Sequence, residues 1–314
     1  MQQVPVSTGP RGLARAIFSD AEFKILQSWL PASPVHSQSY HYMFVPENIS
    51  SRSVAIPLLV RYIQAAHGGA IQRLRQINGN HLDPRIRAKR DQVFAHYPAS
   101  CDDTTIKGFL GEVLAGLICE LHSPGKKIWR VPGYSFHSHD LLFQELLRRV
   151  AGKPPKPSLG RFGDDCIAFC LVKTRSTISR ILLCEAKCTA DHDAALISDA
   201  HGKLSDHPLQ ASVLWLTHLI EALRVSPDPD ASQWVAFIES FRDSQRFDEH
   251  FRNDAVSYTH RRRPKKQVSW IGSAWAHTAY RARRHLTAIE LHLDHTTSAE
   301  FMHFARSTYL AAFP

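Results

Sequence analysis

The amino-acid sequence predicts an α/β fold in which a mixed central sheet is flanked by helices. Apolar runs of strand length alternate with amphipathic stretches of helical length, and this order of helix, strands, helix, strands and helix suits an α/β core. With 314 residues, of which 44% are hydrophobic and 21% are charged, the chain can bury the core of one large or two modest domains.

The first 98 residues are predicted to form an N-terminal, mainly helical accessory region that ends at Pro98. Its amphipathic stretches are broken by proline-containing loops, which end helices. The predicted helices cover residues 21–30, 55–66 and 84–97. Residues 99–314 are predicted to form the functional core, whose later elements are a helix at 210–223, strands at 267–275 and 286–293, and a closing helix at 298–313.

A helix opens this predicted core after Asp103 or Thr104, either of which can cap its first turn. Apolar residues cover most of the circumference of this helix, which is typical of a buried helix. Glu112 falls on the remaining stripe together with small residues such as Gly108 and Ala115. Small neighbours let the helix pack closely while its one acid projects into a cavity.

The segment that follows is predicted to be a β-hairpin with an acidic and a basic side chain on one face. Residues 166–172 and 178–188 are rich in Ile, Val, Leu, Phe and Cys, and the polar residues 173–177 join them. Because side chains alternate between the faces of a strand, Glu185 and Lys187 share a face. Charged groups rarely occupy an apolar run unless they hold a charged ligand or a metal ion.

The register of this hairpin places a second carboxylate beside Glu185. If the hairpin folds symmetrically about Arg175, Asp165 lies opposite Glu185 on the same face, with the two Cβ atoms roughly 5 Å apart. Two carboxylates at that distance repel unless a cation lies between them. Lys187 then points at whatever the cation binds. Asp164 faces the other side and can cap the turn, so Asp165 is the predicted ligand.

The order of these motifs resembles the PD-(D/E)XK nuclease superfamily, in which a helix Glu precedes an Asp at the start of one strand and a Glu-x-Lys on the next. The matching residues are Glu112, Asp165 and Glu185-Ala186-Lys187. Within the superfamily, Gly163-Asp164-Asp165 and Leu183-Cys184-Glu185-Ala186-Lys187 are similar to motifs of the nuclease-subunit family of the Hachiman anti-phage system. The resemblance runs over residues 112–187 and implies a restriction-endonuclease-like core, to which the helical N-terminal region is an extension.

The resemblance implies a metal-dependent endonuclease that hydrolyses phosphodiester bonds of nucleic acid, with DNA as the expected substrate. Asp165 and Glu185 would bind Mg²⁺ (or Mn²⁺) together with the backbone carbonyl of Ala186, and Glu112 would hold the ion through water or bind a second one. Lys187 would orient or deprotonate the attacking water and neutralise charge on the phosphate. The Hachiman likeness further implies an effector of a prokaryotic anti-phage defence system with a superfamily 2 helicase as partner.

One departure from the superfamily pattern is the long piece of chain between Glu112 and Asp165. It is predicted to hold an extra helix at 141–150 and a proline-rich loop at 153–157. This insertion obscures the first core strand, for which residues 127–131 are the candidate.

The charge of the chain agrees with a polyanionic partner. The formal net charge is +9 and the sequence pI is about 9.4, and counterion release drives basic proteins onto phosphate backbones. The basic residues predicted to bind nucleic acid are Arg87, Arg90, Arg261, Arg262, Arg263, Lys265 and Lys266. For any single cluster of this kind, a solvated surface is the alternative interpretation.

Cysteines and histidines suggest other metal sites only weakly. Strand residues four apart lie about 13 Å from each other, so the Cys-x₃-Cys pairs cannot share a zinc ion. The hairpin register instead predicts buried, reduced thiols, with Cys166 opposite Cys184 on the face away from the site. His139, Asp140 and His201 are second-rank candidates for contacts with phosphate.

A cytoplasmic location is expected. No apolar run approaches the roughly 20 residues needed to cross a bilayer, and the N-terminus lacks a secretory apolar segment.

Two other classes of function remain open. The first alternative is a catalytically inactive subunit that binds nucleic acid or a helicase through its basic face. The second is a metal-dependent hydrolase of small phosphoesters or nucleotides, which predicts a narrow, closed pocket.

Overall fold

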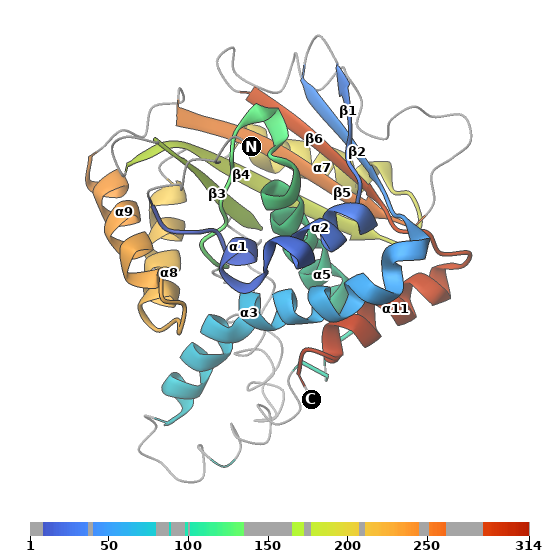
Figure 1. Ribbon diagram of the computed structural model, residues 1–314, viewed down its shortest axis with the longest axis horizontal. Helices are drawn as coiled ribbons and strands as arrows, with labels where there is room; N and C mark the ends of the chain where they lie inside the picture. The colour runs from blue at the N-terminus through green and yellow to red at the C-terminus, as the bar shows by residue number, and fades with distance from the viewer. Residues whose placement is uncertain are drawn as a thin grey trace.

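The computed structural model of the protein describes residues 9–36, 40–79, 88, 98–99, 101–134, 165–172, 177–206, 211–244, 251–261 and 285–313. These residues form one six-stranded mixed sheet with helices packed on both of its faces (Figure 1). The predicted α/β class is thereby confirmed. The predicted helix at 141–150 and strand at 267–275 lie outside the described residues, as does the predicted helix at 84–97 apart from Ala88.

The elements follow the predicted order over most of the described chain. The helices are α1 (Leu13–Ile17), α2 (Asp20–Trp29), α3 (Arg52–Gly79), α5 (Asp103–His122), α7 (Ala194–Asp206), α8 (Ala211–Arg224), α9 (Ala231–Asp243) and α11 (Ser298–Leu310), with 3₁₀ turns η1 (Ile49–Ser51) and η2 (Pro124–Lys126). The strands are β1 (Ser33–His36), β2 (His41–Pro46), β3 (Cys166–Leu171), β4 (Ile178–Thr189), β5 (Arg252–His260) and β6 (His285–His292). Strands β1, β2 and β5 and helices α1, α7 and α9 are not among the predicted elements.

Four neighbouring strands of the sheet, β2, β6, β5 and β4, run parallel. At the two edges, β1 pairs antiparallel with β2 and β3 pairs antiparallel with β4. The carboxyl ends of the four parallel strands therefore meet at one edge of the sheet, which is where α/β sheets usually bind ligands.

Two layers of helices cover the two faces of this sheet. Helix α5 packs on one face in a core shared with α1, α2, α3 and α11, and α7, α8 and α9 pack on the other face (Figure 1). The cap of α5 is Asp102, whose Oδ1 accepts a hydrogen bond from the Thr105 amide at 2.7 Å. The prediction of Asp103 or Thr104 was therefore wrong by one or two residues. Among the described residues, no helix combines the length and the apolar character that a membrane span requires.

The predicted hairpin register is confirmed. Cys166 pairs with Cys184, and the antiparallel ladder continues in this register until Cys170 pairs with Arg180. A shift after Cys170 then brings Leu171 opposite Ile178, so the symmetry about Arg175 ends before the turn. The shift does not reach the other end of the hairpin, where the candidate site lies.

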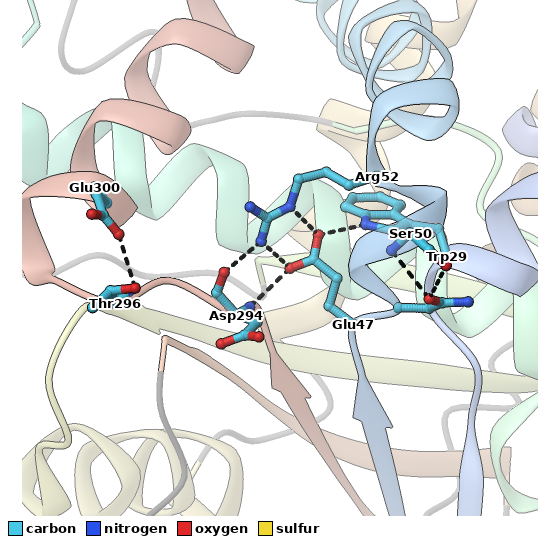
Figure 2. Close-up of polar contacts among 8 residues, drawn as sticks. Trp29, Glu47, Ser50, Arg52, Asp294, Thr296 and Glu300 are labelled. Atoms are coloured by element: carbon cyan, nitrogen blue, oxygen red, sulfur yellow. Dashed lines mark hydrogen bonds and ion pairs between the residues drawn. The ribbon is translucent and has the colours of Figure 1, made fainter.

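The N-terminal region is built into the same sheet as the rest of the protein. Strand β2 pairs with β6, and Glu47, just after β2, joins three segments of the chain (Figure 2). Its carboxylate accepts hydrogen bonds from Trp29 Nε1 at 2.6 Å, Arg52 Nε at 2.6 Å and the Asp294 amide at 2.8 Å. Burial alone would raise the pKa of Glu47, but these donors hold it below its ordinary value.

These contacts show that residues 1–98 contribute two strands as well as helices, so the expectation of a mainly helical region was incomplete. The sequence missed β1 and β2 because short strands that include Pro34 and Pro46 resemble loops. A separate functional role for residues 1–98 stays a prediction.

All six cysteines are free thiols, and five of them are buried. Burial raises the pKa of both Cys119 and Cys188 to about 12, so these groups are neutral at physiological pH. Cys166 and Cys184 face each other across the hairpin within the α5 core. The prediction of buried, reduced thiols is confirmed for this pair.

Candidate active site

Strand β4 and the residue before β3 bring two carboxylates and an ammonium group together. Asp165 Oδ2 accepts a hydrogen bond from the Ala186 amide at 2.7 Å, and the Asp165 amide donates to the Cys184 carbonyl at 3.0 Å. These contacts hold the Asp165 carboxylate against the part of β4 that carries Glu185 and Lys187. Glu185 itself is buried, with 3% of its surface exposed.

Helix α7 adds a third acid, Asp199, and a second lysine, Lys203, to this group. Lys187 Nζ lies 2.9 Å from Glu185 Oε1 and 2.7 Å from Asp199 Oδ2. Lys203 Nζ lies 2.9 Å from the same Glu185 oxygen and 3.3 Å from Asp199 Oδ2. Asp199 and Lys203 were not among the predicted site residues, although their spacing of four residues is typical of an ion pair on one face of a helix.

We refer to Asp165, Glu185, Lys187, Asp199 and Lys203 as the β4–α7 cluster. It opens to solvent on its α7 side, since the Asp199 side chain is 51% exposed and that of Lys203 36%, whereas that of Lys187 is only 13% exposed. A ligand approaching from solvent therefore meets the α7 residues before it reaches Glu185.

The electrostatics of the β4–α7 cluster favour a bound cation beside Asp165. Burial and, second, the negative charge of Glu185 raise the pKa of Asp165 to about 7. The Ala186 amide and the two lysines oppose this rise without cancelling it. A cation between the two carboxylates would relieve their repulsion and lower the pKa of Asp165.

Lys187 keeps its proton at neutral pH. Burial alone would lower its pKa, but the charge of Glu185 and the hydrogen bond to Asp199 outweigh burial and hold the pKa above its ordinary value. A lysine of this kind can neutralise charge on a phosphate and orient a water molecule. It is a poor general base, because a base must lose its proton near the working pH. The raised pKa of Lys187 therefore favours a role in orienting the attacking water over a role in deprotonating it.

Glu112 lies on the helix that covers the opposite face of the sheet. An added Cβ at Gly111 of α5 would lie 2.7 Å from Cys188 Cβ, and one at Gly116 would lie 3.1 Å from Cys166 Sγ. These cysteines are on the face of the hairpin away from Glu185. Burial raises the pKa of Cys166 and Tyr309, and the charge of Glu112 raises both further. Glu112 is therefore a buried acid of the α5 layer.

The donor types of the site suit magnesium. The Asp165 and Glu185 carboxylates and the Ala186 carbonyl are hard oxygen ligands, and Mg²⁺ is usually bound by one or two carboxylates while it keeps several waters. A bound ion would supply a water of lowered pKa and neutralise phosphate charge. In the described part of the chain, no three His, Cys, Asp or Glu side chains are grouped so that they could hold a metal ion. A third His, Cys, Asp or Glu ligand is therefore not preformed among these residues.

The other predicted site residues are placed as follows. Arg261 forms an ion pair with Asp191 at 2.7 Å and donates to the Thr296 carbonyl at 2.6 Å, so its guanidinium is tied to the loop before α11. His201 is fully buried in α7 and burial lowers its pKa to about 4, which excludes the proposed contact with phosphate in this conformation. The predicted residues outside the described ranges are Arg87, Arg90, His139, Asp140, Asp164, Arg262, Arg263, Lys265 and Lys266.

No protein-family model matches the chain, and no curated protein matches it. The case for a function therefore depends on the geometry of the β4–α7 cluster and on the motif resemblance.

Proposed function

We propose that the protein is a metal-dependent nuclease that hydrolyses phosphodiester bonds, with DNA as the expected substrate. The observation that carries this proposal is the position of the Asp165 carboxylate next to Glu185 and Lys187. Asp165 Oδ2 accepts a hydrogen bond from the Ala186 amide at 2.7 Å. Three motif residues, Asp165, Glu185 and Lys187, thus meet at one point. A dicarboxylate with an adjacent ammonium group is suited to hold Mg²⁺ and to stabilise a phosphate in the transition state.

The chain order of the core supports the same proposal. Helix α5 carries Glu112, β3 follows Asp165, β4 carries Glu185 and Lys187, and α7 and the parallel strand β5 come next. Arg130, within the predicted first core strand, forms an isolated antiparallel bridge with Phe169 of β3. This order is compatible with the restriction-endonuclease-like core that the resemblance implies. The proposed setting, a cytoplasmic anti-phage effector with a superfamily 2 helicase partner, rests on the resemblance alone.

A catalytically inactive subunit that binds nucleic acid or a helicase is the second candidate. Lys187 and Lys203 both lie 2.9 Å from Glu185 Oε1, so the charge of this carboxylate is balanced without a metal ion. In this version the β4–α7 cluster stabilises the fold and performs no chemistry.

Incubation of the purified protein with supercoiled plasmid DNA, with and without Mg²⁺, separates the two candidates. We expect cleavage by the wild type only with Mg²⁺, and a loss of about 100-fold or more in Lys187→Ala, because a positive charge next to the phosphate is then missing. Lys24→Ala on α2 removes an equal charge from an exposed position and should leave cleavage unchanged. Cleavage that is as fast in Lys187→Ala as in the wild type would place the active site elsewhere, and an inactive wild type would favour the binding subunit.

A further inference from the structure

A group of basic side chains lies at the edge of the sheet where the parallel strands begin. His41 is the first residue of β2 and His285 the first of β6, while Arg180 lies near the start of β4. Since β2, β6 and β4 are parallel, these starts share one edge. Lys126 and Lys127 join them from the turn after α5. We refer to these five residues as the basic edge.

The turn after α5 approaches the strands closely enough to place its two lysines there. An added Cβ at Gly125 would lie 3.7 Å from His41 Cδ2 and 3.9 Å from Thr287 Oγ1 of β6. The charge of Lys127 also acts on His285: burial, followed by the charges of Arg180, His41 and Lys127, lowers the pKa of His285. Four segments that are distant in sequence therefore meet at the basic edge.

The conformation of this turn is strained and firmly held. Ser123 (φ 50°) and Lys126 (φ 59°) both have left-handed backbone angles, which are unfavourable for a residue with a side chain. Trp129 Nε1 donates to the Pro124 carbonyl at 2.7 Å, and His122 Nε2 lies 2.6 Å from the Leu30 carbonyl. Strain of this kind persists only where the surroundings fix it, so the lysines have a defined position.

The two lysines of the basic edge, Lys126 and Lys127, are not neutralised within the described chain. There, His41, Lys126, Lys127 and His285 form neither an ion pair nor a side-chain hydrogen bond, in contrast to Lys187 and Lys203 of the β4–α7 cluster. Lys126 is exposed, as are His41 and His285. Like charges held together at a surface repel one another, and an anion with several regularly spaced charges relieves this repulsion best.

We propose that the basic edge binds the phosphate backbone of nucleic acid, at a site separate from the β4–α7 cluster. Arg180 and Glu185 are five residues apart on β4, which separates them by about 16 Å. The two sites thus engage different phosphates of a bound nucleic acid. The binding needs no divalent ion and no cleavage, so it does not depend on the nuclease function proposed above.

Fluorescence anisotropy with a labelled DNA duplex, in EDTA and over a range of salt concentrations, tests this site. In Lys126→Gln/Lys127→Gln we expect the Kd to rise at least about fivefold and the slope of log K against log salt to fall by about 2, because each phosphate contact contributes about 0.9 to the slope. The matched control is Lys24→Gln/Lys107→Gln, which changes the net charge equally. Lys107 is on α5 and its charge acts on Cys188, which lies near the other end of β4 from Arg180.

Equal weakening in both double variants would mean that only the overall charge matters and would overturn the proposal, as would unchanged binding in Lys126→Gln/Lys127→Gln. A parallel titration with anionic phosphatidylglycerol vesicles examines a membrane surface as the partner. If the lysine pair is needed for vesicle binding and not for DNA binding, the nucleic-acid assignment is wrong. Because EDTA removes divalent ions, the outcome is the same whether or not the wild type cleaves DNA.

Discussion

Asp165→Asn and Glu185→Gln are each expected to reduce Mg²⁺-dependent DNA cleavage by about 100-fold to 1,000-fold or more. Each substitution removes one of the two carboxylates that would hold the ion and leaves an amide of nearly the same shape. Initial rates of plasmid nicking at saturating Mg²⁺ measure the loss. Asp243→Asn, an exposed acid at the end of α9, is the control and should cleave like the wild type.

The stability of Asp165→Asn distinguishes lost chemistry from a lost fold. The folded pKa of Asp165 is raised to about 7, above the unfolded value of about 3.9. Stability that is fully present below about pH 4 is therefore lost progressively as the pH rises to about 7. Asn cannot ionise, and its side-chain oxygen can still accept a hydrogen bond from the Ala186 amide. Without metal at pH 8, Asp165→Asn should therefore be more stable than the wild type by on the order of 1–3 kcal/mol.

At pH 5 this difference should be smaller by about half or more, because the folded wild-type carboxyl group is then protonated and only the ionisation of the unfolded state still disfavours folding. Urea unfolding at both pH values, in buffer with EDTA, measures it. If Asp165→Asn is less stable than the wild type at pH 8, the two carboxylates do not repel each other, and the electrostatic argument for a cation is wrong.

Arg252→Met is expected to lower the free energy of unfolding by about 3–5 kcal/mol, because it leaves a buried carboxylate without its partner. The Arg252 and Asp254 side chains are both fully buried, and Arg252 Nε lies 2.6 Å from Asp254 Oδ1. Arg252 Nη2 also donates to the Leu204 carbonyl at 2.8 Å, in the last turn of α7. Through this hydrogen bond, the Arg252 side chain connects β5 to α7, the helix that carries Lys203.

Urea unfolding of single and double variants tests this account of the pair. Arg252→Met/Asp254→Leu removes both charges and should regain at least half of the lost stability, since buried pairs can often be replaced by apolar groups. Arg224→Met, which breaks the exposed pair with Glu239, should cost less than about 1 kcal/mol. A cost of that small size for Arg252→Met as well would mean that the buried pair does not fasten α7 to the sheet.

The hairpin and the buried helix could be predicted from the sequence because their patterns are local. The polar residues 173–177 separate two apolar runs, and pairing outward from them places Asp165 opposite Glu185. Strand β5 has no such pattern. It includes Arg252, Asn253 and Asp254, yet every residue of the strand is buried. It is a strand because β4 and β6 pair with it on both sides, and a sequence pattern does not contain that information.

The site was predictable only in the part that depends on this hairpin. Asp199 and Lys203 reach Glu185 because α7 packs on the sheet, and the alternation of side chains along β4 cannot reveal a helix. For Glu112, the helical pattern predicted burial correctly. Which face of the sheet a helix covers is decided by tertiary packing, and α5 covers the face with Cys166 and Cys188.

Titration of the metal-free protein with Mn²⁺, followed by electron paramagnetic resonance of the free ion, tests most directly whether Asp165 and Glu185 hold a divalent ion. The account predicts that the wild type binds Mn²⁺, that Mg²⁺ displaces it, and that Asp165→Asn and Glu185→Gln each weaken binding at least about tenfold. Asp243→Asn should bind like the wild type. A wild type that binds no Mn²⁺, or variants at Asp165 and Glu185 that bind it equally well, would contradict the proposed metal site.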